Sequence, residues 1–252
     1  MTPSVHSRRG VALTLVLWMI VVLGGVAAAV TGMSRNNSEV TSNARARTIA
    51  RYAAESGIVA AVQVLQRQLE AAGDDAERRQ TLLNDAAHAL GDAASFEMGE
   101  ASVRTVMVDA SARIDINAAP EEVLAAILAR SGDAMSAANS ARVIRRHIDS
   151  IPGRAQLLQS LDEARTLPGV DAGVMTRAAP WLTVDGDGQV NSVTAPAEVR
   201  GVARGSLVTE PTRLVLIARG WQRGHPLTHE VQAVYAVQGN QLAFVRLRER
   251  DL

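Results

Sequence analysis

The chain has 252 residues and carries 26 basic and 26 acidic side chains, so its formal net charge at pH 7 is zero. It contains no cysteine, which excludes disulfides, thiolate metal sites and a cysteine nucleophile. Zero net charge argues against a nucleic-acid-binding protein, because such proteins carry a basic surface. The length allows one or two domains with a hydrophobic core.

The amino-terminal residues form an apolar segment behind a basic leader. Residues 11–30 carry no charged side chain, and a helix of that length spans roughly 30 Å, the thickness of a bilayer core. Arg8 and Arg9 precede this segment, and positive charge there favours an amino terminus left in the cytoplasm. The sequence therefore predicts a single-pass inner-membrane anchor with the rest of the chain in the periplasm.

Three interpretations fit this leader: a cleaved signal peptide, a twin-arginine signal, and a short leader that ends at Gly10 before a helix that is retained. The third is favoured because helical periodicity continues after Thr31 and no proline occurs between residues 11 and 85. We predict one helix over residues 11–72, ended by Gly73. Its apolar stripe consists of Ile58, Val62, Leu65 and Leu69.

The middle of the chain has helix signals. In "DINAAPEEVLAAIL", residues 115–128, we expect Asn117 to cap a helix and Pro120 to lie in its first turn. The stretch "VNSVTAPAEVR", residues 190–200, repeats part of this pattern. Between them, Ser160 and Glu163 fit a capping box and Gly169 a helix end.

Strand signals flank this helical middle. "SFEMGEASVRTVMVDASARIDI", residues 95–116, fits two or three strands with a turn at Gly99. Near the end, "TRLVLIARGWQ", "THEVQAVYAVQ" and "LAFVRLRER" read as three strands, with Gly239 and Asn240 as a hairpin turn. We expect the sheet to pack on the stripe of the first helix.

Catalytic signals are poor, and we predict no enzyme: the five histidines show no metal-ligand spacing, and no nucleophile or phosphate-loop motif occurs. In "VDGDGQVN", residues 184–191, the oxygen side chains of Asp185, Asp187 and Asn191 alternate as calcium ligands do. The loop lacks the late glutamate of an EF-hand. A calcium site and a plain turn both stay open.

The helical middle also resembles helix-hairpin-helix modules, which bind DNA. Four arginines cluster there: Arg142, Arg145, Arg146 and Arg154. In such modules a Gly-x-Gly turn holds a phosphate, whereas here the turn reads Gly169-Val170-Asp171, and a carboxylate repels phosphate. We therefore predict a structural helical domain that binds no nucleic acid. The alternative is a membrane-anchored DNA-binding protein of a competence system.

The leader "RRG", the apolar stretch and the amphipathic continuation together resemble a type IV prepilin or pseudopilin. The resemblance implies that a prepilin peptidase cuts after Gly10 and methylates the new amino terminus at Val11. Most pilins have glutamate as the fifth mature residue, where this chain has Leu15. The minor pseudopilin K family of the type II (general) secretion pathway characteristically lacks it. A carboxylate in the bilayer needs a partner, such as a neighbour's terminal amine, so leucine suits a subunit at a filament tip.

The stretches at residues 115–128 and 160–200 resemble the same family. The resemblance implies an α+β fold: a pilin-like long N-terminal helix packed on an antiparallel sheet, with an inserted all-helical, SAM-like domain. The implied parts are a leader (1–10), the membrane half of the helix (11–30), the amphipathic helix with the first strands (31–115), the insertion (116–205) and the last strands (206–252).

The resemblance also implies the role of the protein. A minor pseudopilin belongs to the pseudopilus tip complex, which initiates assembly and supports export of folded proteins across the outer membrane. Its implied partners are other minor pseudopilins, the major pseudopilin, the prepilin peptidase and the inner-membrane assembly platform. Some members of the family bind calcium in the head. A minor pilin of a type IV pilus is the alternative within this class.

Overall fold

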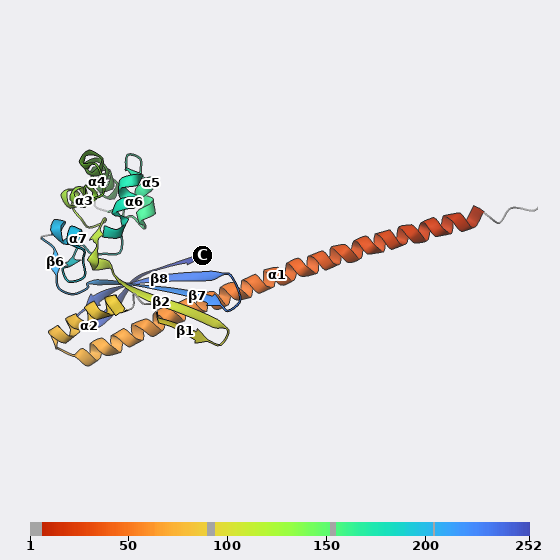
Figure 1. Ribbon diagram of the computed structural model, residues 1–252, viewed down its shortest axis with the longest axis horizontal. Helices are drawn as coiled ribbons and strands as arrows, with labels where there is room; N and C mark the ends of the chain where they lie inside the picture. Colours follow the sequence, from red (N-terminus) through yellow and green to blue (C-terminus); the bar gives the residue numbers. More distant parts are fainter. Residues whose placement is uncertain (1–6, 90–93, 152–154, 204) are drawn as a thin grey trace, which may run out of the picture. The chain divides into compact units, whose positions relative to one another are not determined.

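The computed structural model describes residues 7–89, 94–151, 155–203 and 205–252, with the side chains of 7–14, 30, 32, 34–38, 88, 89 and 94 left out (Figure 1). The chain divides into two compact units, of which the first ends at Thr48 and the second covers Ile49–Leu252.

The chain begins with one long helix, α1 (Ser7–Ala72). It ends where Gly73 adopts a φ of 58°, a left-handed conformation that glycine tolerates without steric cost. The predicted continuous helix is therefore confirmed. In the second unit the predicted stripe is also confirmed, since Ile58, Leu65 and Leu69 are buried and Val62 packs against the same cluster.

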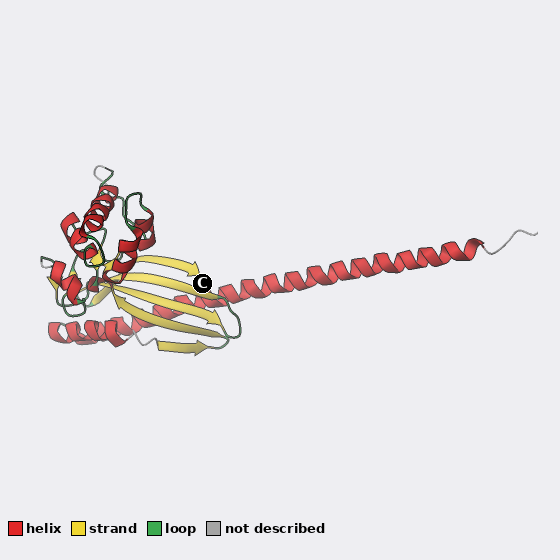
Figure 2. Ribbon diagram, turned by 45° about the horizontal axis from the view of Figure 1, so that its top comes forward, coloured by secondary structure: helices red, strands yellow, loops and turns green. Residues whose placement is uncertain are grey.

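An antiparallel sheet of five strands forms the centre of the second unit, in the order β1-β2-β7-β8-β9. The strands are β1 (Ala94–Met98), β2 (Ala101–Asp109), β7 (Arg213–Gln222), β8 (Thr228–Gln238) and β9 (Gln241–Asp251). Turns at Gly99 and Gly239, both with positive φ, join β1 to β2 and β8 to β9 as the sequence predicts. The predicted α+β class is confirmed (Figure 2).

The sheet and the second half of α1 approach each other closely at Gly220 in β7. A Cβ atom added to Gly220 would lie 2.1 Å from the carbonyl oxygen of Ala50 and 2.6 Å from the backbone nitrogen of Ala54. Only glycine fits here, because the obstructing atoms are helix backbone. The alternate residues of β7, such as Ala218, are buried in the same contact.

A second helix, α2 (Ala76–Ala89), follows α1 and was not predicted. Asp75 caps it by accepting a hydrogen bond from the backbone nitrogen of Arg78 at 3.0 Å. Leu83 of α2 is fully buried in the cluster formed by α1 and the sheet.

The helical middle is inserted between β2 and β7 and has its own hydrophobic core. Its helices are α3 (Glu121–Leu128), α4 (Ala134–Ile148), α5 (Leu161–Thr166), α6 (Ala172–Ala178) and α7 (Ala197–Val202), with 3-10 turns η1 (Ala110–Ala112) and η2 (Ala179–Trp181). It also carries two short parallel ladders that were not predicted. They pair β3 (Ile114–Asp115) with β4 (Leu182–Thr183), and β5 (Val190–Asn191) with β6 (Leu207–Val208).

One predicted cap is wrong and one is confirmed. Asn117 does not cap α3, whose N-cap is Pro120 without a side-chain hydrogen bond. Its amide instead exchanges two hydrogen bonds with the backbone of Leu158, at 3.1 and 2.9 Å, and so joins segments far apart in sequence. The capping box of α5 is present, because Ser160 Oγ accepts from the backbone nitrogen of Glu163 at 3.0 Å.

Candidate functional site

The first candidate region is the apolar part of α1. Every residue from 15 to 29 is exposed, and Leu15 is 62% exposed. Of the predicted processing site, Gly10 and Val11, the structure describes only the helical backbone. The same holds for residues 12–14 and 30 of the predicted anchor.

In the part of the chain that the structure describes, no helix has the length and apolar character needed to cross a membrane.

The loop that holds Asp185 and Asp187 is the predicted metal site. Asp185 pairs with two arginines of β9, Arg246 and Arg248, and the Nε of Arg246 lies 2.8 Å from Asp185 Oδ1. Asp187 accepts a hydrogen bond from Thr212 Oγ1 at 3.0 Å and lies 3.6 Å from Arg213. These carboxylates are neutralised by cations of the protein itself.

The third predicted ligand, Asn191, is directed elsewhere. It is fully buried, and its amide nitrogen donates to Asn84 Oδ1 at 2.9 Å and to Asp109 Oδ2 at 2.8 Å. Among the described residues no group of three or more histidine or acidic side chains could hold a metal ion. The predicted calcium site stays a prediction that titration can test.

A buried carboxylate that the sequence did not single out lies beside this loop. Burial raises the pKa of Asp115 to about 6, although a hydrogen bond from the backbone nitrogen of Asn117 lowers it. The charges of Asp185 and Asp187 raise it further, and Arg246 opposes them. Asp115 therefore favours its neutral form more than an exposed aspartate does.

Two of the four clustered arginines of the insertion are paired with acidic side chains. Arg145 pairs with Asp149 at 2.8 Å, Arg142 lies 3.6 Å from Glu121, and Arg154 is outside the described residues. Asp171 caps α6 by accepting hydrogen bonds from the backbone nitrogens of Gly173 and Val174 at 2.9 and 3.0 Å. These bonds lower the pKa of Asp171. They also occupy N–H groups at the start of α6 that a bound anion would otherwise use.

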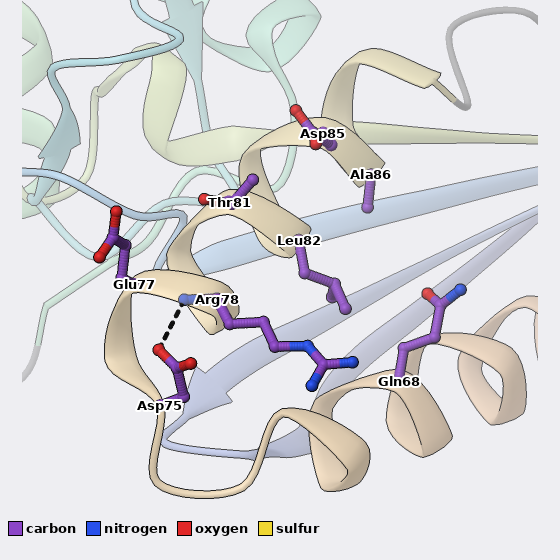
Figure 3. Close-up of a pocket in the computed structure, with 8 residues that line it drawn as sticks. All are labelled: Gln68, Asp75, Glu77, Arg78, Thr81, Leu82, Asp85 and Ala86. Carbon is purple, nitrogen blue, oxygen red and sulfur yellow. Dashed lines mark hydrogen bonds between the residues drawn. The ribbon is translucent and has the colours of Figure 1, made fainter.

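A cavity of about 660 Å³ opens between the end of α1 and α2 (Figure 3). Asp75, Glu77 and Asp85 line it together with Arg78 and Gln68. Asp75 is used as the cap of α2, and the lining contains no histidine, serine or cysteine. The charged side chains of the lining are mainly acidic, with Thr81 as its hydroxyl side chain.

Taken together, the long helix, the antiparallel sheet and the insertion define a pilin-like α+β fold. No protein-family model matches the chain, and no curated protein matches it. A chain in the crystal structure of the GspK-GspI-GspJ complex from the type 2 secretion system of enterotoxigenic Escherichia coli is similar in fold. The TM-score is 0.60 at 14% sequence identity, and the likeness covers 86% of this chain and 99% of that chain. The fold is therefore that of a type II secretion pseudopilin.

Proposed function

We propose that this chain is a minor pseudopilin of a type II secretion system and acts as a non-enzymatic subunit of the pseudopilus tip complex. The observation that carries the proposal is the arrangement of the second unit. The second half of α1 packs on an antiparallel sheet, and a helical insertion separates two neighbouring strands of that sheet. The similar chain comes from a complex of three pseudopilins, which supports other minor pseudopilins as partners.

The amino-terminal sequence supports the processing and location that this role requires. We propose cleavage after Gly10 by the prepilin peptidase, methylation of Val11, and anchoring of residues 11–30 in the inner membrane with the head in the periplasm. In the assembled state the partners would also include the major pseudopilin and the assembly platform.

The tip position is supported by Leu15. A subunit with leucine at this place offers no carboxylate to the terminal amine of a neighbouring subunit within the bilayer. Such a subunit suits the end of a filament, where it would start assembly and thereby support export of folded proteins across the outer membrane.

The test is the mass of the mature protein, produced with and without a prepilin peptidase. We expect the chain to begin at Val11 only when the peptidase is present. A Gly10→Val variant is the control and should keep its leader. A chain that begins near Thr31 in both strains would mean an ordinary signal peptide and would overturn the proposal.

A membrane-anchored DNA-binding protein is the candidate from another class. The carboxylate of Asp171 at the start of α6 disfavours this DNA-binding function, because the carboxylate lies where a phosphate would have to bind. A gel-shift assay with duplex DNA at low salt distinguishes the two functions, since a DNA receptor should bind with a strongly salt-dependent affinity. A type IV pilus minor pilin is disfavoured by the helical insertion.

A further inference from the structure

Three arginines and one glutamate form a row across four neighbouring strands of the sheet. Arg104 of β2 is opposite Arg219 of β7, Arg219 is opposite Glu230 of β8, and Glu230 is opposite Arg250 of β9. The alternate residues of these strands, including Val103, Ala218 and Val231, are buried against α1. The four side chains, here called the arginine row, therefore lie on the sheet face that α1 does not cover.

The glutamate of the row holds two of the arginines in place. The side chain of Glu230 is fully buried and accepts hydrogen bonds from Arg219 Nε at 2.6 Å, Arg250 Nε at 2.8 Å and Gln232 Nε2 at 2.8 Å. Burial alone would raise the pKa of Glu230, but these hydrogen bonds lower it below its usual value. The side chains of Arg219 and Arg250 remain 53% and 59% exposed, so their remaining N–H groups reach solvent.

The arginine row contains more positive charge than negative charge. Arg104 is exposed and stands directly opposite Arg219, and like charges at such positions destabilise a sheet. Within the described residues, no carboxylate forms an ion pair with Arg104. The nearby Glu97 is paired with Arg223 at 2.9 Å. Glu230 neutralises one of the three positive charges, so an excess of two remains. Repulsion between these charges lowers the stability of the fold unless a bound negative group neutralises them.

A partly exposed aromatic side chain lies beside the row. Trp221 lies two residues beyond Arg219 on the same face of β7 and is partly exposed. Arginine and tryptophan are the residues most enriched among those that dominate binding energy at interfaces. The insertion contacts β9 further along this face, where Arg246 and Arg248 meet Asp185, while the side chains of Arg219 and Arg250 stay more than half exposed. The helices of the insertion and the strands of the sheet are drawn in Figure 2.

We propose that the arginine row docks an acidic segment of a partner protein that presents at least two carboxylates. The planar, outward-facing guanidinium groups match carboxylates in two-point hydrogen bonding. An excess of only two charges suits such a segment better than DNA, which needs a larger basic surface, or an anionic membrane, which is bound by clusters of about 4–8 basic residues. This proposal holds whether or not the chain is a secretion subunit.

The test measures binding of a fluorescein-labelled oligo-glutamate peptide to the full-length protein in mild detergent by fluorescence anisotropy. Arg104→Gln is the main variant, since it breaks no ion pair within the described residues. We expect a loss of affinity of about two- to fivefold, as for one exposed ion pair, together with an equal or higher melting temperature. The Arg104→Gln/Arg219→Gln variant should lose more, and raised salt should weaken the wild type.

Arg142→Gln on α4 is the matched control, because its side chain is 56% exposed and the charge change is the same. It should leave the affinity unchanged. Equal losses in the control and in Arg104→Gln would overturn the proposal. It would also fail if phosphatidylglycerol vesicles or duplex DNA, and not the peptide, bound in a manner that depends on Arg104.

Discussion

Asn191 donates a hydrogen bond from its side-chain amide to the carboxylate of Asp109, with 2.8 Å between Nδ2 and Oδ2, although the two residues are 82 positions apart. Both are buried. Asp109 also accepts from Thr194 Oγ1 at 2.5 Å and from the backbone nitrogen of Ser111 at 2.8 Å, while Asn191 reaches Asn84 of α2. The end of β2, the insertion and α2 are therefore joined through one buried polar network.

Replacement of Asn191 by alanine should destabilise this junction. The Asp109 carboxylate would lose a donor in a buried position, and the expected loss is about 2–4 kcal/mol in the free energy of unfolding. Denaturant unfolding followed by tryptophan fluorescence measures it. Asn139→Ala is the control: Asn139 is exposed, makes a bond of 2.9 Å to the carbonyl of Gly169, and should cost about 1 kcal/mol or less. Equal losses in the two variants would contradict this role of Asn191.

Gly220→Ala should force α1 away from the sheet. The new methyl group would overlap helix backbone, which cannot move as a flexible side chain does, and we expect a loss of about 3 kcal/mol. Gly201→Ala in α7 is the control, because the nearest atom to its added Cβ is Arg130 Nη2 at 3.7 Å. It should leave stability unchanged or raise it by up to about 1 kcal/mol. A Gly220→Ala variant with wild-type melting behaviour would show that this close contact is absent in solution.

Stability should fall as pH rises between about 4 and 6 because of Asp115. Its pKa rises from 3.8 to about 6 on folding, mainly through burial, so the folded state binds more protons in this window. Below the window both states are protonated and the contribution is fully present; above it the contribution is lost. The difference corresponds to about 3 kcal/mol at most.

Asp115→Asn should flatten this part of the pH profile and raise stability at neutral pH, since an amide oxygen can still accept from the backbone nitrogen of Asn117. Urea unfolding across the pH range measures both effects. Asp162→Asn, at an exposed position on α5, should keep the wild-type slope. If the free energy of unfolding of the Asp115→Asn variant changed with pH as steeply as that of the wild type, the pH dependence would come from other groups.

Calcium should not raise the melting temperature of the full-length chain. The ion would have to displace Arg246 and Arg248 from Asp185, and two cations already neutralise that carboxylate. Thermal melting and calorimetric titration with calcium measure this. A calcium-induced rise in melting temperature that disappears in the Asp185→Asn variant would contradict this expectation and support calcium binding at Asp185.

The main elements were predictable because their signals are local. The period of the stripe in α1 and the alternation in β2, β7, β8 and β9 mark those elements, and the glycines at 73, 99 and 239 mark their ends. The helix α2 was not predicted, because its sequence "AERRQTLLNDAAHA" is largely polar and shows no clear apolar stripe. Its start is marked by the cap Asp75.

The polar contacts were not predictable, because they depend on tertiary structure. Asn117 is placed in the sequence like a helix cap, but its side-chain amide makes both of its hydrogen bonds to the backbone of Leu158. Asp185 alternates with Asp187 as calcium ligands do, but the sequence does not reveal that β9 brings two arginines to it. In the arginine row, Arg104 on β2 is far in sequence from the residues on β7, β8 and β9, and only the strand register shows that the four lie side by side.

The pairing of β2 with β7 has a consequence for how such a protein can change over time. Asp109 is opposite Leu214 in the ladder, so β2 and β7 form a β-hairpin whose connecting turn has been replaced by residues 110–213. Because this insertion leaves the sheet at Asp109 and returns at the neighbouring position on β7, it can be lengthened, shortened or exchanged without altering the order of the strands. The sheet and the second half of α1 would then stay unchanged. Any other insertion would have to supply new hydrogen-bond partners for the buried carboxylate of Asp109.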